Sequence, residues 1–290
     1  MESREFILKK ISVFLVLTFL LSSIFYHLII SAETIQARSG IFVFALMWCP
    51  GIAGLLTRFY FHKTISGLGW RVGKIRYQLS AYSLPILYAF IVYSIVWLTG
   101  LGGFYNQEFL AKITARLVSA LESDAFAPGE VITLYLLVLA ILGVISHSFS
   151  TLGEEIGWRG FLVPELAKIY SYKQVSLISG GIWLVWHLPI LLFADYNSEA
   201  PVWFSFICFS VMIIAISFAF AWFRLKSDSL WTAVFMHASH NVFIQQFFTP
   251  FTYDTGSTAY FIDEFGVGLA LVTIPVAYFF WKRREILDEF

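Results

Sequence analysis

Charge is scarce in this chain of 290 residues, because Asp, Glu, Lys and Arg together make up only 13% of it. Soluble globular proteins carry roughly 25% charged residues. Hydrophobic residues, by contrast, make up 59% of the chain, and aromatic residues alone 19%. This composition excludes an ordinary soluble domain and predicts an integral membrane protein.

Net charge and cysteine are also lacking. Nineteen Lys and Arg balance nineteen Asp and Glu, so the chain has no basic excess of the kind that nucleic-acid-binding proteins carry. The two cysteines, Cys49 and Cys208, each lie inside an apolar run, where a thiol behaves as a small hydrophobic group. We therefore expect neither a nucleic-acid partner nor a disulfide framework.

Apolar runs are what the chain has in abundance, and eight of them are long enough to cross a bilayer, which takes about twenty helical residues. They lie near residues 11–30, 41–61, 79–101, 131–152, 174–193, 202–223, 230–248 and 265–281. The first is longer than the apolar core of a signal peptide, about 7 to 15 residues, so we expect a membrane anchor. The fourth continues beyond residue 152, and we expect Pro164 to end it. The sequence predicts an all-α polytopic membrane protein, a single domain over 1–290 with about eight transmembrane helices.

The orientation follows from the cations between these runs. Alternate connecting segments, starting with the N-terminus, hold fifteen Lys and Arg, and the other segments hold three. The fifteen are Arg4, Lys9, Lys10, Arg58, Lys63, Arg71, Lys74, Arg76, Lys168, Lys173, Arg224, Lys226, Lys282, Arg283 and Arg284, and the three are Arg38, Lys112 and Arg116. Cytoplasmic loops are enriched in Lys and Arg, so we expect both termini in the cytoplasm and the protein in the cell membrane.

Two connecting segments on the predicted outer side stand out. Residues 104–128 place Phe109, Ile113, Leu117 and Leu121 at helical spacing, which predicts an amphipathic helix on the membrane surface. Residues 249–264 are acidic, and we assign them no chemistry.

Residues 153–160, with the sequence GEEIGWRG, place two adjacent glutamates and an arginine within apolar sequence. One charged side chain at the centre of a bilayer costs about 3 kcal/mol, so these groups need partners and a reason. On a helix, Glu155 and Arg159 lie on the same face and can form an ion pair. Glu154 points about 100° away and is free to face another helix as a general base.

Two later apolar runs hold the other proton-handling groups. Trp183 and His187 lie one turn apart on the fifth predicted helix, and His237, His240 and Asn241 lie together on the seventh. Each group also has a structural interpretation: Glu155 with Arg159 as a stabilising ion pair, His187 as an interhelical hydrogen bonder, and Trp183 and His240 as packing residues. We predict that the three segments form one site.

These motifs resemble those of the CPBP family, which contains CAAX-type prenyl endopeptidases and bacteriocin-processing relatives. The resemblance rests on Glu-Glu-xxx-Arg at 154–159, aromatic-xxx-His at 183–187 and His-xxx-Asn at 237–241, in this order on successive helices. At the position of Trp158 the family more often has Phe or Tyr, and at the position of Trp183 it usually has Phe. Both positions therefore keep an aromatic ring. The predicted catalytic core is about 131–248.

The resemblance implies an intramembrane glutamic protease with a cavity that faces the cytoplasm and no metal. Glu154, assisted by His187, would activate water, and His237 and Asn241 would stabilise the oxyanion. Glu155 and Arg159 would support this geometry, as would Trp183 and His240. The substrate would be a prenylated or other membrane-associated peptide or protein, cleaved near its C-terminus.

Three alternatives stay open from the residues alone. A zinc-dependent intramembrane protease could use the same Glu and His residues, although the sequence has no His-Glu-x-x-His helix. A proton-coupled transporter could relay protons through intramembrane Glu and His, although no repeated halves are visible. A non-catalytic membrane scaffold is the third.

Overall fold

The computed structural model describes residues 2–31, 35–122, 126–194 and 196–286, without the side chains of 35–39, 285 and 286. Arg38, one of the three predicted outer cations, is therefore outside the described side chains. The helices are α1 (Arg4–Ile30), α2 (Ile35–His62), α3 (Ile75–Thr99), α4 (Gln107–Leu121), α5 (Pro128–Val138), η1 (Leu139–Gly143), α6 (Val144–Glu155), η2 (Ile156–Leu162), α7 (Val163–Ala167), α8 (Tyr172–Phe193), α9 (Val202–Ser227), α10 (Trp231–His240), η3 (Asn241–Phe248), α11 (Thr249–Phe251), η4 (Thr258–Tyr260), α12 (Val267–Lys282) and η5 (Arg283–Ile286). Two short strands, β1 (Gly103–Phe104) and β2 (Thr252–Tyr253), pair antiparallel.

Helices occupy all eight predicted places, and the prediction of an all-α polytopic membrane protein is confirmed. Among the described residues, six helices are long and apolar enough to cross a membrane: Arg4–Ile30, Gly40–His62, Ile75–Thr99, Pro128–Ala167, Tyr172–Phe193 and Val202–Ser227. Helix α12 is apolar but shorter, and the segment from α10 to α11 does not meet the same criterion. The number of membrane crossings therefore stays a prediction.

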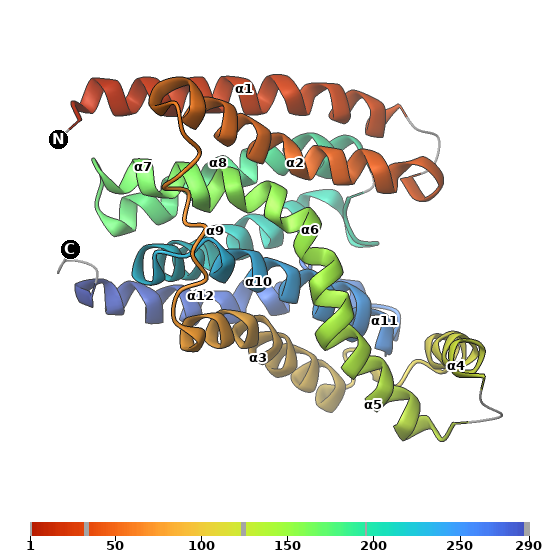
Figure 1. Cartoon of the computed structure of the whole chain (residues 1–290). Helices are drawn as coiled ribbons and strands as arrows, with labels where there is room; N and C mark the ends of the chain where they lie inside the picture. The colour runs from red at the N-terminus through yellow and green to blue at the C-terminus, as the bar shows by residue number, and fades with distance from the viewer. Residues whose placement is uncertain (1, 32–34, 123–125, 195, 287–290) are drawn as a thin grey trace.

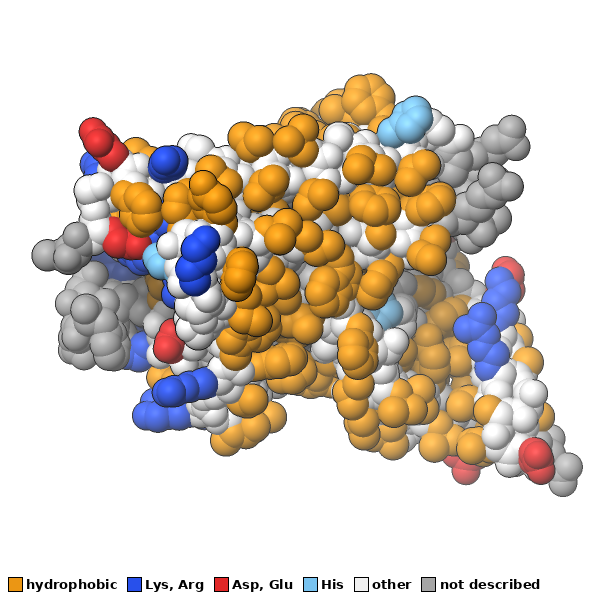
Figure 2. All heavy atoms as spheres, turned by 45° about the horizontal axis from the view of Figure 1, so that its top comes forward, with side chains coloured by type: hydrophobic (Ala, Val, Ile, Leu, Met, Phe, Trp, Pro, Cys, Tyr) orange, Lys and Arg blue, Asp and Glu red, His pale blue; other side chains and the backbone are white. Residues whose placement is uncertain are grey.

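Helices α1, α8, α9, α10 and α12 lie roughly parallel in stacked rows, whereas α5 and α6 run diagonally across them and α4 projects at one end (Figure 1). Helices α1 and α2 form one face, α3 and α12 lie toward the opposite face, and α10 packs between α3, α6 and α9. Figure 2 shows the α1 and α2 side of the molecule, where hydrophobic side chains cover a wide central area. Charged side chains gather at the end that holds the N-terminus, and on the part that projects at the other end. This distribution fits a surface in contact with lipid.

The fourth predicted helix is the longest element, and it is not regular. It runs from Pro128 to Ala167 and includes two π-helical stretches, η1 and η2, the second directly after Glu155. Our prediction that Pro164 ends this helix is wrong, because the helix continues through α7. Pro164 follows directly on the π-helical stretch η2, where the hydrogen-bond pattern of the helix is already irregular, so the missing N–H of proline interrupts no regular α-helical ladder.

Helix α2 packs unusually close to α6 and η2. A Cβ atom on Gly157 would lie 2.5 Å from the carbonyl oxygen of Pro50, and one on Gly153 would lie 2.8 Å from that of Met47. Glycines four residues apart allow two helix backbones to approach in this way. The side of this helix that carries Gly153 and Gly157 is therefore occupied by α2, and Glu154 and Glu155 point elsewhere.

Helix α4 confirms the helix predicted within 104–128. Its Leu110 and Ile113 are buried in a small hydrophobic cluster with Val131 of α5, while its charged residues remain exposed. The helix is amphipathic, and its position at a membrane surface stays a prediction.

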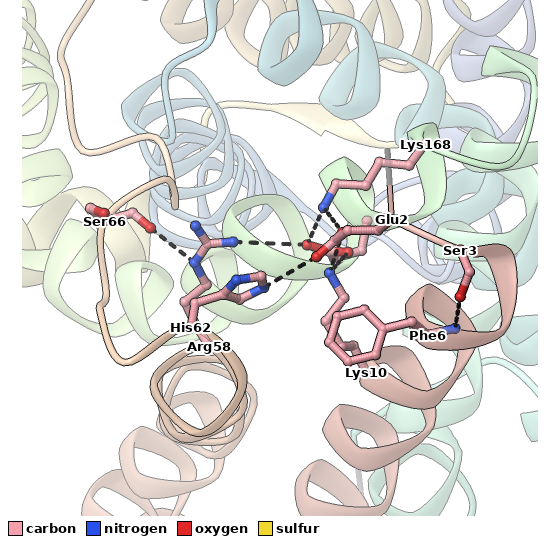
Figure 3. A network of polar contacts seen from close by, with 9 residues as sticks. Glu2, Ser3, Phe6, Lys10, Arg58, His62, Ser66 and Lys168 are labelled. Carbon is pink, nitrogen blue, oxygen red and sulfur yellow. Dashed lines mark hydrogen bonds and ion pairs between the residues drawn. The ribbon is translucent and has the colours of Figure 1, made fainter.

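A cluster of charged side chains joins the start of α1 to the ends of α2 and α7 (Figure 3). Lys10 is completely buried, and its Nζ lies 2.7 Å from Glu2 Oε2 and 2.6 Å from Glu165 Oε2. Lys168 Nζ lies 2.8 Å from both glutamates. We call Glu2, Lys10, Arg58, His62, Glu165 and Lys168 the N-terminal charge cluster.

Candidate active site

A cavity of about 380 Å³ lies between α2, α6, α8, α9 and α10. Glu154, His187, His237 and Asn241, the four predicted catalytic residues, all line it. Trp183 and His240 line it as well, whereas Glu155 and Arg159 lie behind its wall. The structure thus brings together side chains that are up to 87 positions apart in the sequence.

Glu154 is 2% exposed and faces helix α8. Its Oε2 accepts a hydrogen bond of 2.9 Å from the indole Nε1 of Trp183. No other hydrogen bond to this carboxylate occurs within the described part of the chain, so Oε1 is available to a molecule in the cavity. Trp183 therefore orients the predicted general base, and this contact fits both a packing role and a supporting role in the site.

Glu155 is fully buried, and its carboxylate contacts both Arg159 and His237. Its carboxylate accepts hydrogen bonds of 2.8 and 3.1 Å from Arg159 Nη1, which confirms the predicted ion pair. Its Oε1 also lies 2.9 Å from His237 Nδ1 on α10. The guanidinium of Arg159 lies 4.1 Å from the ring centroid of Trp183 and 4.0 Å from that of Phe220. Cation–π contacts of this kind stabilise a desolvated arginine.

The contact between Glu155 and His237 was not predicted, because nothing in the sequence relates the two positions. It links the glutamate motif on α6 to the His-xxx-Asn motif on α10. Since a carboxylate accepts hydrogen bonds, His237 donates from Nδ1, and its Nε2 is the nitrogen left for the cavity. Glu155 therefore sets the orientation of a second predicted catalytic residue.

His187 is oriented by its own helix and by aromatic rings. Its Nδ1 lies 2.8 Å from the backbone oxygen of Trp183, so Nδ1 carries a proton and Nε2 is the free nitrogen. Its ring stacks on Tyr196, with centroids 6.1 Å apart and planes 21° apart. Edge contacts with Trp186 and Phe209 complete the enclosure.

Asn241 begins the π-helical stretch η3. Its side chain lines the cavity and forms no hydrogen bond to the residues that the structure describes. Such π turns are rare and are frequent at functional sites. Here two of them, η2 and η3, directly follow Glu155 and His240, a local irregularity that no sequence pattern indicated.

The loop that precedes α12 supplies a cavity residue that we did not predict. Glu264 is 4% exposed and lines the cavity, although we assigned no chemistry to residues 249–264. It accepts hydrogen bonds from Tyr196 (2.8 Å), His240 (2.9 Å) and Gln245 (3.0 Å). Burial raises the pKa of this carboxyl, but these hydrogen bonds outweigh burial and hold the pKa below its usual value.

His240 therefore has a different environment from His237. Its Nε2 faces Glu264, and its Nδ1 bonds to the hydroxyl of Tyr88. Both ring nitrogens are engaged, so His240 supports the cavity wall. His147, Tyr196 and Gln245 also line the cavity and were not predicted. Their only sequence signal was a polar side chain in or beside an apolar run.

Metal binding at this cavity finds no ready ligand set. Across residues 2–31, 35–122, 126–194 and 196–286, no group of three or more His, Cys, Asp and Glu side chains is arranged to hold a metal ion. The Nδ1 atoms of His187 and His237 face Trp183 and Glu155, and Nε2 of each ring stays available. Metal-binding histidines have partners of the same kind on the second ring nitrogen, so these contacts do not argue against a metal. Zinc stays an alternative that only a measurement of metal content decides.

Comparison with known proteins agrees with the motifs. Residues 130–243 match the family model of the type II CAAX prenyl endopeptidases, Rce1-like, and this range falls on the predicted catalytic core. This part of the chain is therefore similar to CAAX-type prenyl endopeptidases. Its similarity to CAAX prenyl protease 2 of Methanococcus maripaludis is 28% identity over 141 residues, 47% of this chain. The aligned part is 48% of that relative, so the chain spans about half the length of the curated relative that it matches.

Proposed function

We propose that the protein is an intramembrane endopeptidase in which Glu154 activates water for attack on a peptide bond. The observation that carries this proposal is the meeting of Glu154, His187, His237 and Asn241 around one cavity inside a helical membrane protein. The match of residues 130–243 to the Rce1-like type II CAAX prenyl endopeptidase model supports the same chemistry.

Glu154 has the position that a general base requires. One oxygen is fixed by Trp183 and the other is free toward the cavity, where His187 presents Nε2 as an acceptor for a second proton of the same water. The attacking hydroxide adds to the scissile carbonyl, and Glu154 returns the proton to the leaving amine. The C–N bond breaks to give a carboxylic acid and an amine, and transfer of the remaining water proton between them yields a carboxylate and an ammonium group.

The negative charge that develops on the carbonyl oxygen needs donors. Asn241 offers its amide N–H groups, which are not used by the described residues. His237 donates from Nε2 only if both ring nitrogens carry protons, and the carboxylate of Glu155 at Nδ1 suits that state. Glu155 and Arg159 act as positioning residues in this proposal.

The substrate that we propose is the C-terminal region of a prenylated or otherwise membrane-associated protein, and the cell membrane with cytoplasmic termini is the proposed location. Two observations support a membrane-associated substrate: the apolar walls of the cavity, and the name of the archaeal relative, a CAAX prenyl protease.

The decisive test measures cleavage of matched prenylated and unprenylated tail peptides by the purified protein and by Glu154→Gln. We expect the variant to lose at least about a thousandfold in rate, in the range of general-base catalysis. Glu5→Gln, an exposed position on α1, is the control and should cleave like the parent. Equal rates for the parent and Glu154→Gln would refute the assignment.

A second experiment, removal of metal with a chelator, tests the alternative of a zinc-dependent protease. Exhaustive treatment with a chelator, followed by elemental analysis, should leave the activity unchanged and reveal no stoichiometric zinc. Activity that disappears on chelation and returns with zinc would replace Glu154-driven catalysis by a metalloprotease mechanism.

A further inference from the structure

A second cavity lies on the outside of the molecule, between the N-terminal half of α1 and the C-terminal half of α2. This groove has a volume of about 570 Å³ and is separate from the candidate active site. Its lining residues are Lys9, Val13, Leu17, Leu56, Thr57, Phe59, Tyr60, Phe61 and Lys63, so its walls are apolar and its one charged end is basic. We call it the α1–α2 groove.

The two lysines of this groove contrast with their neighbour Lys10. Lys10 is buried between Glu2 and Glu165 in the N-terminal charge cluster, whereas Lys9 and Lys63 are exposed. Among the described residues, no carboxylate lies within 4.0 Å of either ammonium group. Lys63 Nζ lies 5.6 Å from the ring centroid of Tyr60, beside the groove. Two positive charges without a nearby carboxylate therefore lie at the same end of the α1–α2 groove.

Thr57 is the second observation that points to a ligand. Its side chain is completely buried and lines the groove, yet its hydroxyl has no hydrogen-bond partner in the described structure. The hydroxyl of Thr18 in α1, by contrast, bonds to the carbonyl four residues earlier. An unpaired buried hydroxyl costs about 1–3 kcal/mol, so a partner at this position is expected.

The lysines, the Thr57 hydroxyl and the apolar side chains of the groove lie at successive depths, in the same order as the phosphate, the ester carbonyls and the acyl chains of a glycerophospholipid. Thr57 precedes Lys63 by six residues, about 9 Å of helix, which places the hydroxyl below the basic end and above the apolar side chain of Leu17 and its neighbours. A phospholipid has its phosphate outermost, ester carbonyls below it and acyl chains beneath. The lipid-facing side of α1 and α2 is the surface shown in Figure 2.

We propose that the α1–α2 groove binds one anionic glycerophospholipid. The phosphate lies between Lys9 and Lys63, and the hydroxyl of Thr57 donates to an ester carbonyl. One acyl chain runs along Val13, Leu17 and Leu56. This site is independent of the proposed peptidase activity.

A groove of similar volume, about 560 Å³, lies between α3, α9 and α12 and includes Arg76 and Arg283. No buried, unpaired side-chain N or O atom among the described residues lines it. It therefore lacks the second observation that distinguishes the α1–α2 groove.

The test is native mass spectrometry of the full-length protein in detergent, titrated with phosphatidylglycerol or with phosphatidylcholine of the same acyl chains. We expect one phosphatidylglycerol to bind tightly and phosphatidylcholine to bind more weakly. Lys9→Gln and Lys63→Gln should each weaken phosphatidylglycerol binding roughly fivefold, and the double variant roughly 25-fold. Thr57→Val keeps the shape and charge and should weaken both lipids to a similar, smaller extent.

Lys173→Gln, an exposed cation at the start of α8, is the matched control and should bind like the parent. Inorganic phosphate is the competing probe, and it should displace the lipid only weakly because it lacks acyl chains. The proposal is overturned if the double variant binds phosphatidylglycerol as the parent does. Equal binding of the two lipids by the parent, or full displacement by inorganic phosphate, would overturn it as well. Melting curves of all variants verify that each is folded.

Discussion

Two clusters of buried charged residues in this protein differ in how completely their charges are paired. In the N-terminal charge cluster, Lys10 and Glu165 are buried, and both are surrounded by groups of opposite charge. In the candidate active site, Glu155 and Arg159 neutralise each other, but the adjacent Glu154 receives one hydrogen bond and keeps an oxygen free toward a cavity. The first cluster is closed and the second is open.

The two clusters show that the role of a buried charge in a membrane protein depends on whether neighbouring groups of opposite charge compensate it. A charge with full compensation stabilises a junction between helices, in this case between α1, α2 and α7 (Figure 3). A charge left without compensation has a cost, and the fold retains it at a place where a substrate or water can reach it. Glu154 and Glu155 are adjacent, yet they fall on different sides of this division.

The largest expected effect comes from removing the compensation in the open cluster. Glu155→Gln leaves Arg159 buried without its carboxylate and frees His237, so we expect a loss of about 3–5 kcal/mol in stability together with the loss of the proposed peptidase activity. The double variant Glu155→Gln with Arg159→Met should recover most of the stability and none of the activity. Recovery of both in the double variant would show that His237 does not depend on Glu155.

A smaller effect is expected from separating α2 from the helix that carries the glutamates. The Cβ of Gly157→Ala would lie 2.5 Å from the carbonyl oxygen of Pro50, so the two helices must move apart. We expect about 2 kcal/mol of destabilisation from overpacking, and roughly a hundredfold loss of rate from misplacement of Glu154. Thermal unfolding and peptide cleavage measure the two effects.

Gly181→Ala is the matched control for that substitution. Gly181 lies within α8 with open space at its Cβ position, and alanine favours helix there by about 0.5–1 kcal/mol. Its melting temperature should not fall. A Gly157→Ala variant that behaves like Gly181→Ala would contradict the close approach of the two helices.

In the closed cluster, the corresponding change should affect stability alone. Glu165→Gln leaves Lys10 with Glu2 as its remaining acid, so we expect a cost of about 2 kcal/mol, below that of the open cluster. Cleavage rates measured well below the melting temperature should match those of the parent. A large fall in rate at such temperatures would remove the distinction between the two clusters.

The smallest effect is a dependence of stability on pH. Burial raises the pKa of Glu2, but the cations Lys10 and Lys168 outweigh it and lower the pKa from 4.5 to about 2. A carboxyl whose pKa is lower in the folded state stabilises the protein above its unfolded pKa. This contribution should therefore be lost as the pH falls from about 4.5 toward 2. Since Glu2 is partly exposed, we expect a melting-temperature difference of only about 2 °C between the parent and Glu2→Gln at neutral pH. The two curves should converge in acid, and a difference that persists below the folded pKa would contradict this account.

The sequence predicted which residues form the candidate site better than it predicted the contacts among them. Glu154, His187, His237 and Asn241 were identified from motifs, and the structure places all four around one cavity, although their catalytic roles stay predictions. The ion pair of Glu155 with Arg159 followed from helical spacing, which is a local property. Glu264 was missed because it lies in an acidic loop whose burial depends on contacts with Tyr196 and His240, far away in the chain.

The sequence alone determined that this is a helical membrane protein and where its helices lie, because hydrophobic run length and helical periodicity are properties of neighbouring residues. Only the tertiary structure decided that helix continues through Pro164, that π turns follow Glu155 and His240, and that Glu155 bonds to His237. These features arise from packing between segments distant in sequence. The division of the two glutamates into one compensated and one free carboxylate is likewise a result of that packing.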